Sequence, residues 1–170
     1  MDRGIDALAA LRDSLRAAGN RERAGLFSCT GCVAWCCRAG FNSMRATPLE
    51  AEAVARHLEA RGLLPEALER CGEAVERFRL GADPSLRRTY TCPFLTAGNL
   101  CGVHEAKPLG CIAFTPVRDG GCDLDARRLG AALEEAARRN DAAFGEGAWE
   151  DLPLPMAVLR RRYRFFPRAT

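Results

Sequence analysis

Residues 29–37 read CTGCVAWCC, and this stretch places four cysteines within nine positions, a density too high for ordinary core packing. Cys29 and Cys32 form a C-x2-C pair, which in a tight turn brings both sulfurs to one metal ion. Cys36 follows after three residues, and closely spaced thiolates of this kind are typical of iron–sulfur ligation. Because adjacent side chains point apart, Cys36 and Cys37 are not expected to ligate the same single ion. Either the pair faces two metal sites, or one cysteine is a ligand and the other is buried.

A second group of cysteines lies further along the chain, at gaps of eight, nine and ten intervening residues. Its members are Cys92, Cys101, Cys111 and Cys122. This half contains no C-x2-C knuckle, so it does not encode a zinc ribbon on its own. We therefore expect a site that combines these thiols with the first group. His104 is a further candidate ligand or hydrogen-bond acceptor.

The ninth cysteine, Cys71, follows a different pattern. It lies on one face of a predicted helix together with Leu64, Leu68, Val75 and Phe78. On such a face a cysteine is usually a small buried hydrophobic residue. The remaining eight thiols are enough for two four-thiolate sites or for one polynuclear site. Trp35, beside the cysteine pair, either shields the site from water or fills the core, and we favour the core.

The chain has 170 residues, of which 48% are hydrophobic and 28% are charged, a composition typical of a globular protein. Charged residues interrupt the first fifteen positions, and no apolar run approaches the roughly 20 residues needed to span a bilayer. We therefore expect a cytoplasmic protein without a secretory signal or a membrane partner. In that reducing compartment, nine cysteines favour metal or redox chemistry over a disulfide framework.

The net charge is only +3. The one basic concentration consists of Arg160, Arg161, Arg162 and Arg164. A solvated helix face is favoured over a patch for nucleic acid or an acidic partner. No nucleic-acid partner is expected, and an unknown protein partner stays open. The sequence shows no Ser/His/Asp constellation, no phosphate-binding glycine loop and no supported pair of catalytic carboxylates.

Apolar spacing and capping residues predict a mainly α fold, a small helical domain that spans residues 1–170 with few or no short strands. Thr47-Pro48-Leu49-Glu50 has the pattern of a capping box, and Gly62 is the expected terminator of the helix that follows. The expected helices are 2–18, 48–61, 65–81, 124–144 and 155–164.

Two irregular Cys-rich metal-binding segments, 29–37 and 92–122, separate these helices. Short strands or turns are plausible around Thr89–Thr91 and Ile112–Phe114. A segment as long as 92–122 without regular structure needs contacts that order it, and metal–thiolate bonds would supply them.

Three stretches carry a family resemblance: CTGCVAWCC, the helix start TPLEAEAVARHL, and CPFLTAGNLCGVHEAKPLGCIAF. Together they resemble the CxxCxxCC family of zinc- or iron-chelating proteins, also called YkgJ-like cysteine-cluster proteins, over about residues 29–116. The resemblance implies seven cluster cysteines, namely Cys29, Cys32, Cys36, Cys37, Cys92, Cys101 and Cys111. Cys122 lies outside this motif, so its place as an eighth candidate metal ligand rests on spacing alone.

These observations favour a metal-binding protein with an iron–sulfur cluster of the 4Fe–4S type, acting in electron transfer or as an accessory protein. The alternative is a zinc-stabilised interaction module, because zinc also accepts four thiolates. A metal-dependent or methyl-transferring enzyme is the third alternative, since some relatives carry the cluster on a flagellin lysine methylase. The sequence favours a chain that is not an enzyme on its own.

Overall fold

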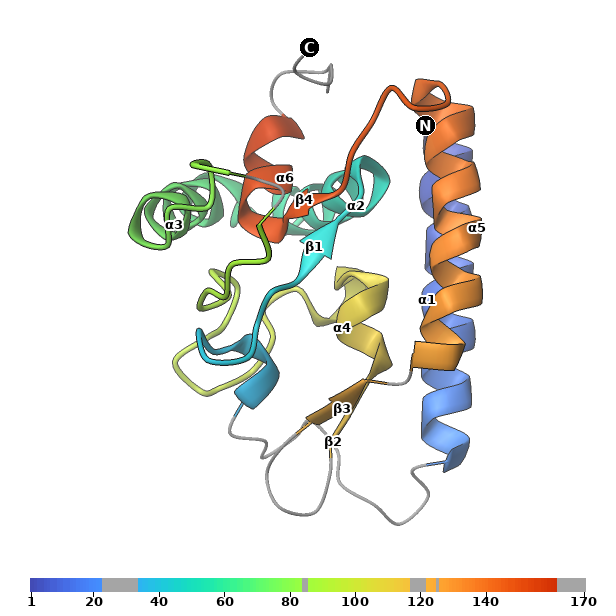
Figure 1. Cartoon of the computed structure of the whole chain (residues 1–170), viewed down its shortest axis with the longest axis horizontal. Helices are drawn as coiled ribbons and strands as arrows, with labels where there is room; N and C mark the ends of the chain where they lie inside the picture. The colour runs from blue at the N-terminus through green and yellow to red at the C-terminus, as the bar shows by residue number, and fades with distance from the viewer. Residues whose placement is uncertain (23–33, 84–85, 117–121, 125, 162–170) are drawn as a thin grey trace.

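The computed structural model describes residues 1–22, 34–83, 86–116, 122–124 and 126–161, and helices dominate these ranges (Figure 1). The α-helices are α1 (Asp2–Glu22), α2 (Pro48–Glu59), α3 (Leu64–Arg77), α4 (Leu109–Ala113), α5 (Ala126–Phe144) and α6 (Leu154–Arg160). Two 3-10 turns are η1 (Trp35–Cys37) and η2 (His104–Ala106). The short strands are β1 (Arg45–Ala46), β2 (Phe114–Pro116), β3 (Cys122–Leu124) and β4 (Leu152–Pro153). The prediction of a mainly α fold is confirmed.

The boundaries of α2 follow directly from its sequence. The Thr47 side chain accepts a hydrogen bond from the N–H of Glu50, and the Glu50 carboxylate accepts one from the N–H of Thr47. This is the predicted capping box, and Pro48 occupies the first turn. After the helix ends, Gly62 takes a φ of 69°, which a residue without a Cβ adopts at little steric cost.

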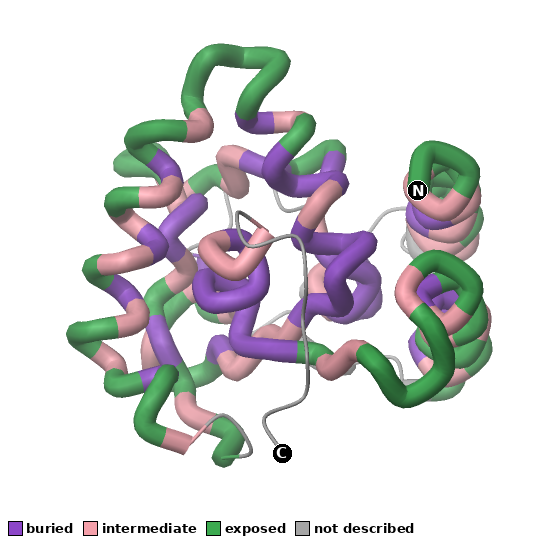
Figure 2. The backbone as a smooth tube through the Cα atoms, turned by 90° about the horizontal axis from the view of Figure 1, so that it is seen from above, coloured by how far each residue is buried: buried purple, intermediate pink, exposed green. Residues whose placement is uncertain are grey.

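Two groups of helices bury two separate apolar clusters. α1 and α5 lie side by side and run in opposite directions, and α4 packs against both (Figure 1). Leu8, Leu109 and Leu129 belong to the cluster among these three helices. The larger cluster lies around α2, α3 and α6, and it forms the buried centre in Figure 2.

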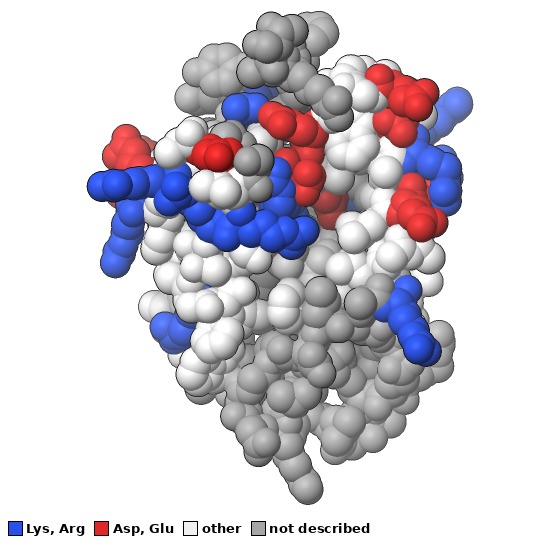
Figure 3. All heavy atoms as spheres, in the orientation of Figure 1, with Lys and Arg blue, Asp and Glu red and all other residues white. Residues whose placement is uncertain are grey.

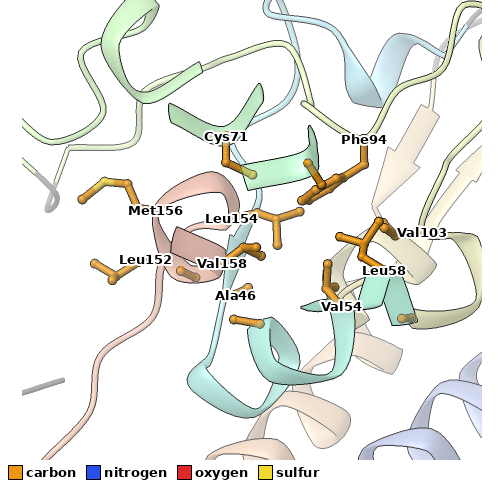
Figure 4. Packing of buried hydrophobic residues seen from close by; sticks show 14 of the residues in the cluster. Ala46, Val54, Leu58, Cys71, Phe94, Val103, Leu152, Leu154, Met156 and Val158 are labelled. Carbon is orange, nitrogen blue, oxygen red and sulfur yellow. The ribbon is translucent and has the colours of Figure 1, made fainter. Parts of the chain in front are cut away.

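Cys71 lies inside the larger cluster, near Phe94 and Leu154 (Figure 4). Its side chain is 0% exposed, so the prediction of a buried core cysteine is confirmed. Burial raises the pKa of its thiol to about 12, and the nearby Cys92 contributes to this shift. The thiol therefore stays neutral at physiological pH, as a core residue should.

Tyr90 links the segment before β1 to the start of α6 through hydrogen bonds. Its side chain is completely buried, and its hydroxyl donates a hydrogen bond to the carbonyl of Met44 and accepts one from the N–H of Leu154 at 3.2 Å. Its own N–H donates to the carbonyl of Asn42 at 2.8 Å. These bonds hold the chain around residue 90 against the chain around residue 42, directly beside the cysteines.

The strands form two small antiparallel sheets. In the first, β1 pairs with β4, and Ala46 lies opposite Leu152. In the second, β2 pairs with β3, and Phe114 lies opposite Leu124. The second sheet joins the end of α4 to the region before α5 (Figure 1).

Several predicted boundaries are wrong. The first helix continues beyond residue 18 to Glu22. α3 ends at Arg77 and not near Gly81, because Arg79 takes a left-handed φ of 52° that a helix cannot continue through. The last helix runs only to Arg160 within the described residues.

The segment 92–122 is also more regular than expected. Residues 109–113 form the helix α4, so of the short strand or turn expected around Ile112–Phe114 only Phe114 belongs to a strand. Residues 89–91 form no strand. Pro108 immediately precedes α4, and the short run that follows lacks the length from which a helical period can be recognised.

Charged side chains of both signs adjoin one another across the upper part of the face in Figure 3. Arg160 forms an ion pair with Glu150 at 3.1 Å, and Arg161 pairs with Glu52 at 2.6 Å and Glu59 at 3.1 Å. Arg162 and Arg164 lie outside the described residues. None of the described helices combines the length and the apolar composition needed to cross a membrane.

Candidate metal centre

Cys36 and Cys37 lie in η1, a single 3-10 turn that follows Ala34 in a left-handed conformation. The N–H of Cys37 donates to the carbonyl of Ala34 at 2.9 Å, which closes the turn. A hydrogen bond joins the two cysteine side chains and is the main cause that raises the pKa of Cys37, ahead of burial. The sequence predicts that these side chains diverge, and this prediction is wrong because the tight turn brings the sulfurs together.

Cys92 lies beside η1 because the backbones of the two segments are bonded. The N–H of Cys92 donates to the carbonyl of Cys37 at 2.8 Å. Burial raises the pKa of the Cys92 thiol to about 12, and Cys101 and Cys36 contribute in the same direction. Backbone hydrogen bonds from Phe94 and Leu95 oppose this rise, since N–H groups that point at a sulfur stabilise its thiolate form.

Cys101 returns to Cys92 through a tight loop. Leu95 and Cys101 form an isolated antiparallel bridge, and the N–H of Gly102 donates to the carbonyl of Phe94 at 2.8 Å. A Cβ at Gly102 would lie 3.0 Å from that carbonyl oxygen, so this close approach favours glycine. The loop therefore places two cysteines separated by eight residues next to each other.

Cys111 comes from a third segment, the helix α4. Burial raises its pKa well above the ordinary value, and Cys92 and Cys101 are the next largest causes. Lys107 opposes the rise because its positive charge favours the thiolate. These effects on its pKa indicate that Cys111 lies near Cys92 and Cys101.

Five thiols from three separated segments thus lie near one another, and they are called the thiol group below. They are Cys36, Cys37, Cys92, Cys101 and Cys111, and each of these residues is half-buried. The six cysteines with described side chains, Cys71 included, are thiols and not halves of disulfides.

The remaining candidate ligands cannot be placed within this group. Cys29 and Cys32 lie outside the described residues, and Cys122 is described only as the first residue of β3. Among the side chains that the structure describes, no three or more of the His, Cys, Asp or Glu type are arranged as a group that could hold a metal ion. The described thiols lie near one another, but no three of them are arranged to hold one metal ion.

The chemistry of the donors nevertheless fits a thiophilic metal. Burial is the largest cause that raises the pKa values of Cys92 and Cys111, and the neighbouring groups that act on Cys37, Cys92 and Cys111 are other cysteines, backbone N–H groups and Lys107. Several thiolates so close together would repel one another, and a cation between them would reverse that repulsion. All-sulfur donor sets favour zinc or iron–sulfur clusters over magnesium or calcium.

Trp35 does not fill the core, so the favoured interpretation from the sequence is wrong. It is 39% exposed, and its ring packs edge-to-face on Phe41, with 4.9 Å between the ring centroids. Phe41 is 56% exposed. The two rings form an aromatic pair on the surface beside Cys36 and Cys37.

Neither histidine joins the thiol group in the described structure. His104 is exposed in η2, and its pKa is lowered first by partial burial and then by the charge of Lys107. His57 is half-buried in α2, with Nε2 3.4 Å from Nη1 of Arg61.

Three charged residues surround the start of α4 in a way that the sequence does not predict, namely Arg12, Arg16 and Glu50. Glu50 is recognisable in the sequence as a capping-box residue, but nothing there shows that it also reaches α4. Arg12 and Arg16 are four residues apart, which places them on one face of α1. That spacing is the only sequence signal for them.

The expected resemblance to the YkgJ-like family stays a prediction from the motifs. No family model, no curated protein and no solved structure matches this chain.

Proposed function

We propose that this chain is a cytoplasmic metal-binding protein whose cysteine cluster holds an iron–sulfur centre, with a role in electron transfer or as an accessory protein. The observation that carries the proposal is the convergence of Cys36, Cys92 and Cys111 from three separate segments, each influencing the ionisation of another. The contact between the adjacent thiols of Cys36 and Cys37 favours a centre with more than one metal atom. Cys29 and Cys32 would supply further thiolates to this centre.

The bound centre would supply redox chemistry or a fixed positive charge. The chain would contribute thiolates from η1, from the loop that carries Cys92 and Cys101, and from α4. Hydrogen bonds from the N–H groups of Phe94 and Leu95 to the Cys92 sulfur would tune the centre, because such bonds stabilise negative charge on sulfur. Trp35 and Phe41 would limit the access of water from one side.

A zinc-stabilised interaction module is the second candidate. The same thiol donors support it, because zinc also takes four thiolates. The loops between residues 86 and 108 contain little regular structure, and a structural metal would stabilise them.

Anaerobic purification followed by an absorbance spectrum and metal and sulfide analysis tests the proposal. We expect a brown protein that contains iron and acid-labile sulfide and that bleaches reversibly with a reductant. A colourless, redox-silent protein with stoichiometric zinc would replace the first proposal by the second. A protein that contains neither metal, even after reconstitution with Fe²⁺ and sulfide or with Zn²⁺, would refute both.

A further inference from the structure

The backbone of residues 104–109 is held by side chains from other helices. This segment connects Cys101 to Cys111 and includes η2 and the first residue of α4. Two arginines of α1 and one glutamate of α2 make hydrogen bonds to its peptide groups. Such long-range bonds from side chains to backbone fix where a short segment lies, because the segment has little regular structure of its own.

Arg12 makes the first of these contacts. Its Nε donates to the carbonyl of Lys107 at 3.0 Å, and the residue is only 3% exposed. Burial lowers the pKa of its guanidinium, and the charge of Glu50 partly offsets this effect. Burying an arginine costs free energy unless its charge is compensated, so the burial of Arg12 indicates a specific structural role.

Arg16 continues the contact one helical turn further along α1. Its Nη2 donates to the carbonyls of His104 at 2.7 Å and Glu105 at 3.0 Å. Its Nη1 also forms an ion pair with the Glu105 carboxylate at 3.6 Å. Together with Arg12, it binds three carbonyl groups of the segment within four residues.

Glu50 binds the other end of the segment from α2. One carboxylate oxygen accepts the N–H of Leu109 at 2.8 Å, and the other accepts the N–H and the hydroxyl of Thr47 at 2.8 and 2.9 Å. The glutamate is 2% exposed. One buried carboxylate therefore caps α2 and fixes the start of α4, only two residues before Cys111.

We propose that Arg12, Arg16 and Glu50 are positioning residues that hold α4 so that the Cys111 thiol faces Cys92 and Cys101. The effect of these residues on metal affinity rests on the function proposed above. Residues that orient the ligands of a metal typically change its affinity about 10–100-fold when they are replaced. The three residues lie on α1 and α2, so they couple the helical framework to the thiol group.

The test compares Arg12→Met and Arg16→Met with the control Arg56→Met. Arg56 of α2 also links the two helices, through Asp2 of α1 at 2.8 Å, and it pairs with Glu52 within α2 at 2.8 Å, but neither bond involves residues 104–109. Anaerobic titration with Co²⁺ measures affinity, and the thiolate-to-cobalt charge-transfer band reports how many sulfurs bind. Each variant is also combined with Cys111→Ser in a double-mutant cycle.

We expect Arg12→Met and Arg16→Met to weaken Co²⁺ binding at least about 10-fold and to reduce the charge-transfer band, while Arg56→Met binds like the parent protein. In the Cys111→Ser background the same substitutions should have little further effect, because the thiol that they position is already gone. Additive losses in the cycle, or a loss equal to that of Arg56→Met, would overturn the positioning role.

A second measurement does not depend on metal. The rate at which iodoacetamide alkylates Cys111 in the metal-free protein is followed by mass spectrometry, with the core residue Cys71 as the internal reference. We expect both arginine substitutions to speed the reaction of Cys111 relative to Cys71. Unchanged relative rates would refute the inference even if the parent protein binds metal.

The two measurements separate the two proposals. A parent protein that binds no Co²⁺ would refute the metal centre, and faster alkylation of Cys111 would still support the positioning role. Arg16 is partly exposed, so Arg16→Met still tests the positioning role if Arg12→Met does not fold.

Discussion

The six cysteines with described side chains fall into two chemical classes. Cys71 is a neutral, fully buried thiol inside the larger apolar cluster, whereas the five clustered cysteines keep partial exposure, and two of them, Cys92 and Cys101, pack against that apolar cluster. The apolar period of α3 predicts this distinction for Cys71 before any coordinates are known. The same period gives no information on the clustered cysteines, because they lie outside long helices.

Replacing Cys71 by Ala tests this division. We expect the free energy of unfolding to fall by about 1–2 kcal/mol, since the substitution removes a buried sulfur and leaves a small cavity. Metal content should not change. Urea denaturation and metal analysis of the purified variant are the measurements, with Cys101→Ser as the comparison that should lose metal. A Cys71→Ala protein that loses its metal would place this thiol in the cluster instead of the core.

The exposure of Trp35 does not follow from its residue type. A tryptophan beside a cluster of buried groups is usually a core residue, and its hydrophobic character alone favours that interpretation. The 3-10 turn instead directs its ring outward onto Phe41. The direction of a side chain in a short irregular turn depends on a few backbone angles that no sequence period encodes.

Elements with strong local signals are the ones that sequence analysis places correctly. The capping box at Thr47 and the left-handed Gly62 frame α2 as predicted, and α5 extends over nearly all of its expected range. The short helix α4 was not predicted, because five residues contain little more than one turn. Its position depends on contacts with α1 and α5 and on the hydrogen bond from Leu109 to Glu50 of α2, all of which are distant in sequence.

The junction between α2 and α6 yields a prediction on pH. Glu52 accepts hydrogen bonds from Arg56 at 2.8 Å and from Arg161 at 2.6 Å. Burial alone would raise its pKa, but the two arginines outweigh burial and lower the pKa below 4.5. A carboxylate with a lowered pKa adds stability above its unfolded value, and that stability is lost as the pH falls through the folded value.

We therefore expect Glu52→Gln to lower the free energy of unfolding by about 1–2 kcal/mol at pH 7 and by much less near pH 3. Urea denaturation at several pH values measures the difference. The control is Glu135→Gln, which removes ion pairs within α5 alone and should have a smaller effect. An equal loss for Glu52→Gln at both pH values would show that its ionisation does not contribute.

At the scale of the whole molecule, the proposed metal binding would be coupled to the release of protons. The thiols of Cys37, Cys92 and Cys111 have raised pKa values, so they carry protons at neutral pH in the metal-free protein. A thiol ligates as its thiolate, so each such ligand must release a proton when metal binds. Affinity should therefore increase as the pH rises.

We expect the affinity for Zn²⁺ to increase about 10-fold per pH unit for each proton released, between pH 6 and pH 8. Competition with a chromophoric chelator at fixed ionic strength measures the affinity, and proton release into a weakly buffered solution counts the protons. An affinity that does not change over this range would contradict ligation by these thiols.

The helical character of the chain, the start and end of α2 and the burial of Cys71 follow from short-range information. Helix periodicity, capping residues and glycine conformations act within a few residues, so they can be recognised from the sequence. The grouping of Cys36, Cys92, Cys101 and Cys111, the outward ring of Trp35 and the bonds of Arg12, Arg16 and Glu50 to the α4 segment are different. They arise from contacts between segments that are tens of residues apart, and the packing of two helical groups, which no local pattern encodes, sets those contacts.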